Sequence, residues 1–225
     1  MAARVDHTEA MENYVKAIYA LQRRGEDKPV STTALAERMD VTPASVSGMV
    51  KKLADRGLVR HVPYKGVELS VDGEALALEV LRHHRLLELY LAESLGLPWD
   101  RVHDEAEVLE HVLSEELEEL IATKLGDPKV DPHGDPIPTR ELEMPESETV
   151  ALESLEAGEA GTFVRVSDSD PAMLRYLSDR GISPGDSFTV VDKQPFDGPL
   201  FLRFGADTHV IGGTLARVMR VEVAR

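Results

Sequence analysis

The sequence predicts an α+β protein of several domains, and three observations along its 225 residues lead to this prediction. Up to about residue 125, apolar residues recur at the spacing of three and four that marks amphipathic helices. Five of the 13 prolines then fall within 126–148, which indicates a linker. After residue 148, apolar and polar residues alternate along short runs, as they do in half-buried strands. We therefore expect domains over 1–72, 73–125 and 149–225.

The first domain is predicted to contain three helices and a β-hairpin. Spacing and turn residues place helices over 9–24, 31–39 and 43–56, and paired strands over 58–62 and 66–71. Ser31 is suited to cap the second helix, and Thr42-Pro43 supplies a cap and a first-position proline for the third. This order of elements is that of a winged helix-turn-helix domain, with Lys65 at the tip of the wing.

The predicted third helix is suited to enter the major groove of DNA, because its exposed face is made of small and polar residues. Large side chains there would hold the helix away from the bases, which lie in a groove about 12 Å wide. The groove-facing candidates are Thr42, Ala44, Ser45, Ser47 and Gly48, and the basic residues placed to meet phosphates are Lys51, Lys52, Arg56 and Lys65. The alternative is a packing unit of three helices that has no contact with DNA.

The charge of the chain is distributed unevenly, although its formal total is −16. Residues 1–65 carry a net charge of +3, residues 66–148 carry −16 and residues 149–225 carry −3. The first segment is therefore suited to an anionic partner and the second to cations, unless the acidic helices serve only to keep the protein soluble.

Composition excludes several classes of protein. The sequence has no cysteine, so thiol nucleophiles, disulfides and Cys-based zinc sites are ruled out. It shows neither the apolar stretch of a signal peptide nor an apolar run long enough to cross a membrane. We therefore expect a cytoplasmic protein.

The middle domain is predicted to consist of two amphipathic helices, over 74–95 and 99–125. Their carboxylates and imidazoles gather on two faces, with His84 and Glu88 on the first helix and His103, Glu107, Glu110 and His111 on the second. Packing such groups inward is costly unless a divalent cation joins them, whereas a solvated face needs no cation. Oxygen-rich donors with imidazole and no thiolate suit Mn²⁺ or Fe²⁺, and Zn²⁺, Co²⁺ or Ni²⁺ can substitute in vitro. The first helix carries more apolar residues than one packed side needs, so we expect it to help form a dimer, and complete burial in the core of a single chain is the alternative.

Residues 149–225 are predicted to form a small β-barrel. Short strands are expected over 162–166, 187–192, 200–204, 208–211 and 216–223. One helix, over about 171–180, is expected among them, with Asp170 as its cap, Pro171 at its first position and Gly181 after its end.

These features together resemble the diphtheria toxin repressor family of metal-dependent transcriptional regulators. The resemblance covers essentially the whole chain, and its most specific strings are HDEAxxxEH, beginning at His103, and PHGDPIP, beginning at Pro132. The string LSDRGISPGDSFTV resembles the SH3-like barrel of the FeoA type. Within the family, the chain is most similar to the long, three-domain form of the manganese-responsive, MntR-type branch, because iron-sensing members carry a cysteine where this chain has Glu107.

The resemblance implies two sets of metal ligands. One set is Glu107, Glu110 and His111, and the other is His84, Glu88 and His103. The barrel adds ligands in long members, for which Asp170 is our candidate with Asp168 behind it, although Asp170 is equally suited to cap its helix. Asn13 stands where the family usually has Asp or Met, and Glu12 beside it is the alternative ligand.

The resemblance also implies a mechanism. Metal would fix helix 9–24 against helix 99–125 and so set the spacing of the two winged domains in a homodimer formed through the middle domain. Such a dimer binds a palindromic operator when loaded with metal and represses metal-uptake genes. We expect DNA and a second copy of the chain as partners, no membrane and no enzymatic activity.

Three alternatives stay open at this point. The first is an iron-responsive regulator of the same family. The second is a metal-independent winged-helix regulator of the MarR kind, which would leave the histidines and glutamates of the middle domain without a role. The third is a di-metal carboxylate enzyme, but that chemistry uses Glu-x-x-His on two helices and the sequence contains no such motif.

Overall fold

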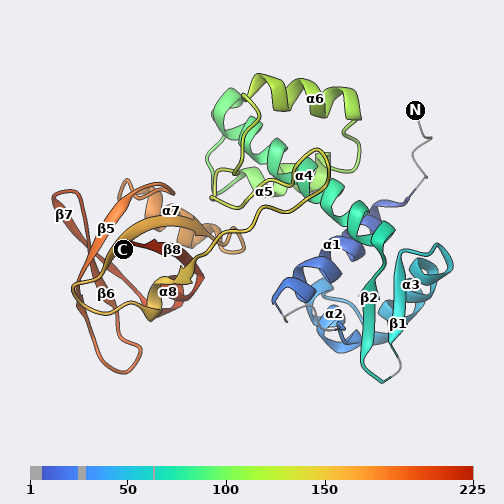
Figure 1. Ribbon diagram of the computed structural model, residues 1–225, viewed down its shortest axis with the longest axis horizontal. Helices are drawn as coiled ribbons and strands as arrows, with labels where there is room; N and C mark the ends of the chain where they lie inside the picture. The colour runs from blue at the N-terminus through green and yellow to red at the C-terminus, as the bar shows by residue number, and fades with distance from the viewer. Residues whose placement is uncertain (1–6, 25–28, 63, 225) are drawn as a thin grey trace. The chain divides into compact units, whose positions relative to one another are not determined.

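The computed structural model describes residues 7–24, 29–62 and 64–224, and Figure 1 shows the order of its helices and strands. Contacts within the chain divide it into two units. The first unit comprises Met1–His83, Glu110–Leu113 and Pro138–Met144, and the second comprises His84–Leu109, Ser114–Ile137 and Pro145–Arg225. The boundary after His83 falls inside α4 (Val71–Leu95), so each unit contains part of this helix.

The first unit begins with the predicted winged helix-turn-helix. Its elements are α1 (Glu9–Arg24), α2 (Thr32–Met39), α3 (Pro43–Asp55), β1 (Val59–Val62) and β2 (Gly66–Leu69). The Ser31 hydroxyl accepts a hydrogen bond from the Ala34 amide at 3.1 Å, and Thr42 does the same for Ser45 at 3.2 Å, so both predicted caps are confirmed. β1 and β2 pair in antiparallel register, and Pro63 of the predicted turn lies outside the described residues.

One apolar core joins the three helices to the hairpin. Ile18 of α1, Leu35 of α2, Leu53 of α3 and Val67 of β2 are completely buried in it. Short helices gain most of their stability from burying one face, so this shared core sets the position of α3 relative to α1.

Helix α4 begins a few residues earlier than predicted. The Ser70 hydroxyl accepts a hydrogen bond from the Gly73 amide at 3.0 Å and so closes the first turn of the helix. Most apolar side chains of α4 are buried within the chain, among them Leu76, Leu78, Leu86, Leu87, Leu89 and Leu91, whereas Val71 and Leu95 at its two ends are 85% and 64% exposed.

The single helix predicted over 99–125 is wrong. The structure has two helices there, α5 (Val102–Leu109) and α6 (Glu115–Lys124). The Ser114 hydroxyl accepts a hydrogen bond from the Leu117 amide at 3.3 Å and caps α6. A serine hydroxyl satisfies a free amide at the start of a helix, so Ser114 fixes the point at which α6 begins.

The proline-rich stretch 126–148 contains no helix or strand, but part of it is buried. An isolated bridge pairs Val130 with Pro136. Asp131, His133 and Ile137 are each at most 5% exposed. This stretch therefore packs against the rest of the chain as well as connecting two domains.

The C-terminal part of the second unit is a six-stranded antiparallel sheet with two helices (Figure 1). Its strands run in the order β3-β8-β4-β5-β6-β7. They are β3 (Val150–Ala151), β4 (Ala160–Val166), β5 (Ser187–Lys193), β6 (Leu200–Phe204), β7 (Asp207–Ile211) and β8 (Met219–Val223). Register shifts in β4 and β5 mark bulges, which increase the local twist of a sheet.

The predicted strands and helix of this part are confirmed except at one end. The strand expected over 216–223 begins only at Met219, because α8 (Gly213–Val218) takes the preceding residues and buries Leu215 and Ala216. The predicted helix is α7 (Pro171–Ser178), capped by Asp170. A short 3₁₀-helix, η1 (Leu152–Ser154), follows β3. None of the helices described is both long and apolar enough to cross a bilayer.

Phe163 of β4 is completely buried in the apolar core between the sheet, α7 and α8. We expect Phe163→Ala to lower the free energy of unfolding of this part by about 3–5 kcal/mol, because it removes buried area and leaves a cavity. Calorimetric unfolding of the full chain measures the change. Phe196→Ala is the control, since Phe196 is 100% exposed and its loss should cost less than about 0.5 kcal/mol. Equal effects of the two substitutions would contradict this account of the core.

Candidate metal centres and DNA-binding surface

Four charged or imidazole side chains meet in the first unit, and we call them the Glu110 cluster. Glu12 and Lys16 come from α1, and Glu110 and His111 follow α5. His111 Nδ1 lies 2.6 Å from Glu12 Oε2, and His111 Nε2 lies 3.4 Å from Glu110 Oε1. The ammonium of Lys16 lies 2.6 Å from the same Glu110 oxygen. Glu110 is completely buried, so this site holds two carboxylates and one ammonium largely away from water.

The hydrogen bond to Glu12 orients the imidazole of His111. A carboxylate only accepts hydrogen bonds, so Nδ1 carries the proton and the lone pair of a neutral ring is on Nε2. His111 Nε2 and Asn13 Oδ1 are both buried atoms without a hydrogen-bond partner. Buried polar atoms are rarely left unpaired in folded proteins, and a bound cation is one partner that satisfies a ring nitrogen. His111 Nε2 and Glu110 Oε1, which lie 3.4 Å apart, therefore fit a divalent cation as two of its donors.

A second group, the His103 cluster, lies in the second unit and consists of His84, Glu88, His103 and Asp168. His84 Nε2 lies 3.0 Å from Glu88 Oε1 and 3.2 Å from His103 Nδ1. His103 Nδ1 lies 2.9 Å from Asp168 Oδ2, so the loop after β4 reaches the helices here. One donor atom from each of the four residues falls within 4.8 Å of the others, which is close enough for one ion to be shared.

The electrostatics of the His103 cluster favour positive charge at its centre. Hydrogen bonds that the His103 imidazole donates to Asp168 and then to Glu88 raise the pKa of His103 to about 10, against the opposing effect of burial. Burial raises the pKa of Glu88, but the imidazoles of His103, His133 and His84 outweigh it and hold that pKa well below its usual range. Without a metal, the cluster therefore holds protons between its carboxylates.

The structure brings together most of the predicted ligands, but some of them lie in a different group from the one predicted. Asp168 joins the His103 cluster, whereas the carboxylate of Asp170 accepts a hydrogen bond from the Ala172 amide at 2.9 Å as the cap of α7. Glu107, predicted with Glu110 and His111, has a carboxylate oxygen 3.8 Å from His84 Nδ1 and 3.9 Å from His103 Nε2. Glu12 takes part through His111.

Sequence reasoning missed two buried polar residues of this region, Asp131 and His133. With Glu88 they form a further group whose donor atoms lie within 4.8 Å of one another. The available signal was the PHGDPIP string, which contains His133 and directly follows Asp131 but served only as evidence of the family resemblance. Both residues lie in a proline-rich stretch, so no helical periodicity placed them on a common face.

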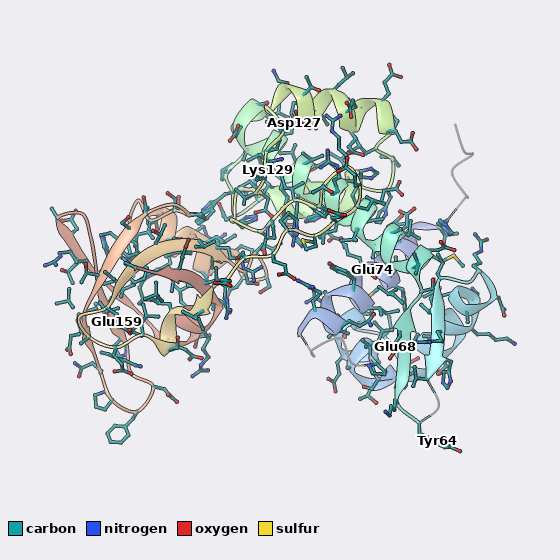
Figure 2. All side chains as sticks on the ribbon, viewed as in Figure 1. Tyr64, Glu68, Glu74, Asp127, Lys129 and Glu159 are labelled. Atoms are coloured by element: carbon teal, nitrogen blue, oxygen red, sulfur yellow. The ribbon has the colours of Figure 1, made fainter. Side chains whose placement is uncertain are left out.

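The residues predicted to meet DNA lie on the surface of the first unit. The nine candidates are all exposed: Thr42, Ala44, Ser45, Ser47, Gly48, Lys51, Lys52, Arg56 and Lys65. Among the residues described, no atom comes within 4 Å of the place where a side chain at Gly48 would begin, so the face of α3 is open there. At the tip of the hairpin, Tyr64 projects away from the first unit (Figure 2).

Three family models match the chain in sequence order. Residues 6–67 match the N-terminal DNA-binding domain of iron-dependent repressors, and residues 70–139 match their metal-binding and dimerisation domain. Residues 150–223 match the FeoA domain. These matches confirm the fold class predicted from the sequence.

Relatives and solved structures agree with these matches. The iron-dependent repressor IdeR of Mycobacterium tuberculosis is 32% identical over 94% of this chain and 96% of its own length. The diphtheria toxin repressor of Corynebacterium diphtheriae is 31% identical over 96% and 98%. A manganese-dependent transcriptional repressor in complex with manganese is 40% identical, with a TM-score of 0.86 over 95% of this chain and 100% of that one. ScaR with bound Cd²⁺ is 29% identical, with a TM-score of 0.78 over 94% and 98%.

The two relatives and the manganese-bound structural neighbour are transcriptional repressors, and none of them is an enzyme. The winged domain, the carboxylate–imidazole clusters and the C-terminal sheet fall in the order that the three family models describe. The chain therefore belongs to the family of metal-dependent transcriptional repressors that includes the diphtheria toxin repressor and IdeR.

Proposed function

We propose that this protein is a manganese-responsive repressor that binds a palindromic operator as a homodimer and controls metal-uptake genes. The observation that carries the proposal is the Glu110 cluster, where His111 Nε2 is buried without a hydrogen-bond partner and lies 3.4 Å from the completely buried carboxylate of Glu110. A divalent cation would supply the charge that joins these groups. Glu12, Asn13 and Lys16 lie on α1, and α1 shares a core with α3, so an event at this cluster acts on the DNA-binding helix.

Mn²⁺ is the ion we propose, with Fe²⁺ as the alternative. Carboxylate, carbonyl and imidazole donors without thiolate suit Mn²⁺, and Zn²⁺, Co²⁺ or Ni²⁺ would bind the same donors in vitro. The 40% identical neighbour with manganese supports this choice, whereas the 32% identical relative is iron-dependent. The operator titration described below therefore includes both ions.

Exposed apolar side chains of the helical region support the proposed dimer. Most leucines of α4, which the sequence analysis expected either to help form a dimer or to be buried in one chain, are buried within the chain, and Leu95 at its end is 64% exposed. α5 and α6 leave Val108, Leu117 and Leu120 exposed by 71%, 48% and 61%. We infer that the second copy docks on these residues. The two α3 helices of the dimer, one from each copy, then need to lie about one DNA turn apart, which is roughly 34 Å, or a multiple of that distance.

Substitution of the Glu110 cluster should uncouple DNA binding from metal. We expect His111→Ala and Glu110→Gln to lower the Mn²⁺-stimulated affinity for the operator at least tenfold, because each removes a donor from the proposed ion. Fluorescence anisotropy at fixed salt, with chelator, Mn²⁺ or anaerobic Fe²⁺, measures the affinity; salt is held constant because phosphate contacts depend on it.

The control for this experiment is His209→Ala, which removes an imidazole from β7. It should leave the response to metal unchanged. Full stimulation in both His111→Ala and Glu110→Gln would contradict the proposed role of the Glu110 cluster. A wild-type protein that binds a confirmed operator equally well with and without metal would favour the metal-independent regulator.

Lys16 should act as a competing cation in the Glu110 cluster. Its ammonium lies 2.6 Å from the Glu110 carboxylate. An incoming ion would have to share that carboxylate with the ammonium or displace the ammonium. We expect Lys16→Met to raise the affinity for Mn²⁺ about tenfold, because a buried carboxylate then lacks this positive neighbour. Isothermal titration measures the affinity. Lys16→Arg keeps the charge and serves as the control. An unchanged affinity for Mn²⁺ in Lys16→Met would contradict the proposed competition between the Lys16 ammonium and the ion.

Metal binding at the His103 cluster should release protons. The pKa of His103 is raised to about 10 in the metal-free protein, so its ring is protonated at pH 7.5, whereas a ligating ring nitrogen must be bare. Affinity for Mn²⁺ at this cluster should therefore rise with pH up to about pH 10. Titration calorimetry in buffers of different ionisation enthalpy counts the protons released. Asp168→Asn removes the main cause of the raised pKa and should reduce that count, and a heat independent of buffer in the wild type would contradict the assignment.

A further inference from the structure

We propose that Gln22 is a positioning residue that ties the wing, which is the hairpin of β1 and β2, to α1, so that metal at the Glu110 cluster sets where the tip of the wing meets the operator. The proposal rests on the proposed function in taking that cluster as a metal site and DNA as the partner. All the residues that carry it belong to the first unit.

The outer edge of β2 presents two backbone amides, and residues outside the hairpin satisfy both. In an antiparallel pair the amides of alternate residues point to the same edge, so those of Val67 and Leu69 point away from β1. The Val67 amide donates a hydrogen bond to the carbonyl of Val30 at 2.9 Å, and the Val30 amide donates to the carbonyl of Val67 at 2.8 Å. The Leu69 amide donates to Gln22 Oε1 at 3.2 Å. Gln22 therefore completes the edge of the wing from α1.

The base of the wing is held closely on both sides. Gly66 has a φ of +129°, and a Cβ there would lie 2.0 Å from the carbonyl oxygen of Val30, so only glycine allows this approach. Directly after β2, the Ser70 amide donates to the carbonyl of Leu58 at 3.0 Å, and its hydroxyl donates to the carbonyl of Gly57 at 2.6 Å. The wing therefore follows the elements that hold its base.

Helix α1 connects Gln22 to the Glu110 cluster as one continuous element. It contains neither proline nor glycine, and Val15 and Ile18 in its middle are completely buried. Glu12, which accepts the hydrogen bond from His111, lies ten residues before Gln22, or about 15 Å along the helix. Rigid elements of this kind carry coupling between distant sites. A shift of α1 at the cluster therefore reaches the Leu69 amide.

The tip of the wing carries groups that suit the phosphate backbone of DNA. Tyr64 is fully exposed and projects away from the first unit (Figure 2), and Lys65 beside it is exposed as well. Tyrosine hydroxyls and lysine ammonium groups are among the side chains that contact DNA phosphates. The tip therefore fits the backbone beside the bases that α3 reads.

The test compares Gln22→Leu with the wild type by fluorescence anisotropy on the operator, with chelator and with Mn²⁺ at fixed salt. Leucine has a similar size but cannot accept a hydrogen bond. We expect the operator affinity of the Mn²⁺-loaded variant to fall about fivefold, as the loss of one hydrogen bond implies, while the affinity with chelator stays unchanged. Isothermal titration without DNA should give an unchanged Mn²⁺ affinity, because every donor of the Glu110 cluster remains.

A double-mutant cycle shows whether Gln22 acts through the wing. In a Lys65→Ala background the contact of the wing tip is already weakened, so Gln22→Leu should cost less than about twofold. Lys51→Ala removes a matched ammonium from the exposed face of α3. In that background Gln22→Leu should still cost about fivefold, because independent losses multiply.

Three further variants complete the experiment. Gln22→Glu keeps an acceptor at the same place and should bind the operator as the wild type does. Gln194→Leu makes the same change as Gln22→Leu at an exposed position between β5 and β6, and it should leave every affinity unchanged. Gln22→Ala admits water to the Leu69 amide and replaces Gln22→Leu if circular dichroism shows that Gln22→Leu does not fold.

Each outcome decides the proposal. A loss of affinity with Mn²⁺ that disappears in the Lys65→Ala background supports it. Wild-type affinity in the folded Gln22 variants overturns it. An equal loss in the Lys65→Ala and Lys51→Ala backgrounds also overturns it, because Gln22 then acts through the core of the winged domain. So does an equal loss with chelator, since the contact is then independent of metal.

Failure of the proposed function is distinguishable from failure of this proposal. A wild type that binds a confirmed operator equally with and without metal overturns both, and that result is seen before any variant is made. A wild type that responds to metal, together with a Gln22→Leu variant that responds equally, overturns only the role of Gln22.

Discussion

The burial of carboxylates in the helical region is the constraint on which the rest of this structure depends. Glu88 is 1% exposed and Glu110 is completely buried, and ionised carboxylates in such places are strongly destabilising unless positive charge is close by. The chain supplies part of that charge itself, as the ammonium of Lys16 beside Glu110 and the imidazoles of His84, His103 and His133 around Glu88. These contacts recruit α1, the proline-rich stretch and the loop after β4 to the helices.

Arginine side chains of α4 order part of the proline-rich stretch 126–148. The side chain of Arg82 donates a hydrogen bond to the carbonyl of Pro138 at 2.7 Å in the first unit, and that of Arg85 donates to Pro136 in the second. Proline lacks an amide hydrogen but keeps its carbonyl, so arginines from a helix can fix a proline-rich stretch through acceptors alone.

Sequence patterns predicted the features whose causes are local. Ser31, Thr42 and Asp170 each lie directly before a helix, and their capping depends only on amides two or three residues away. Periodicity likewise placed the strands and the winged domain. Ser114 carried the same local signal, but the apolar pattern around it continued and concealed the break between α5 and α6.

The parts that the sequence could not reveal depend on contacts between residues far apart in the chain. Periodicity shows which face of a helix a residue occupies, but not which loop will meet that face. Asp168 and Asp170 are equivalent by composition, and only the path of the loop after β4 brings Asp168 to His103. The hydrogen bond that His111 donates to Glu12 joins residues 99 positions apart, and no helical spacing predicts it.

A sensor that carries its own competing cation has a physical advantage over a site made of bare carboxylates. The Glu110 cluster without Lys16 would hold a divalent ion more tightly, and a site that is full at every metal concentration reports nothing. An internal ammonium lowers the net gain on metal binding, because the ion replaces an existing favourable contact. On the proposed function, this cation shifts the affinity towards the range in which metal concentration varies, while it keeps the buried carboxylate compatible with a folded metal-free protein.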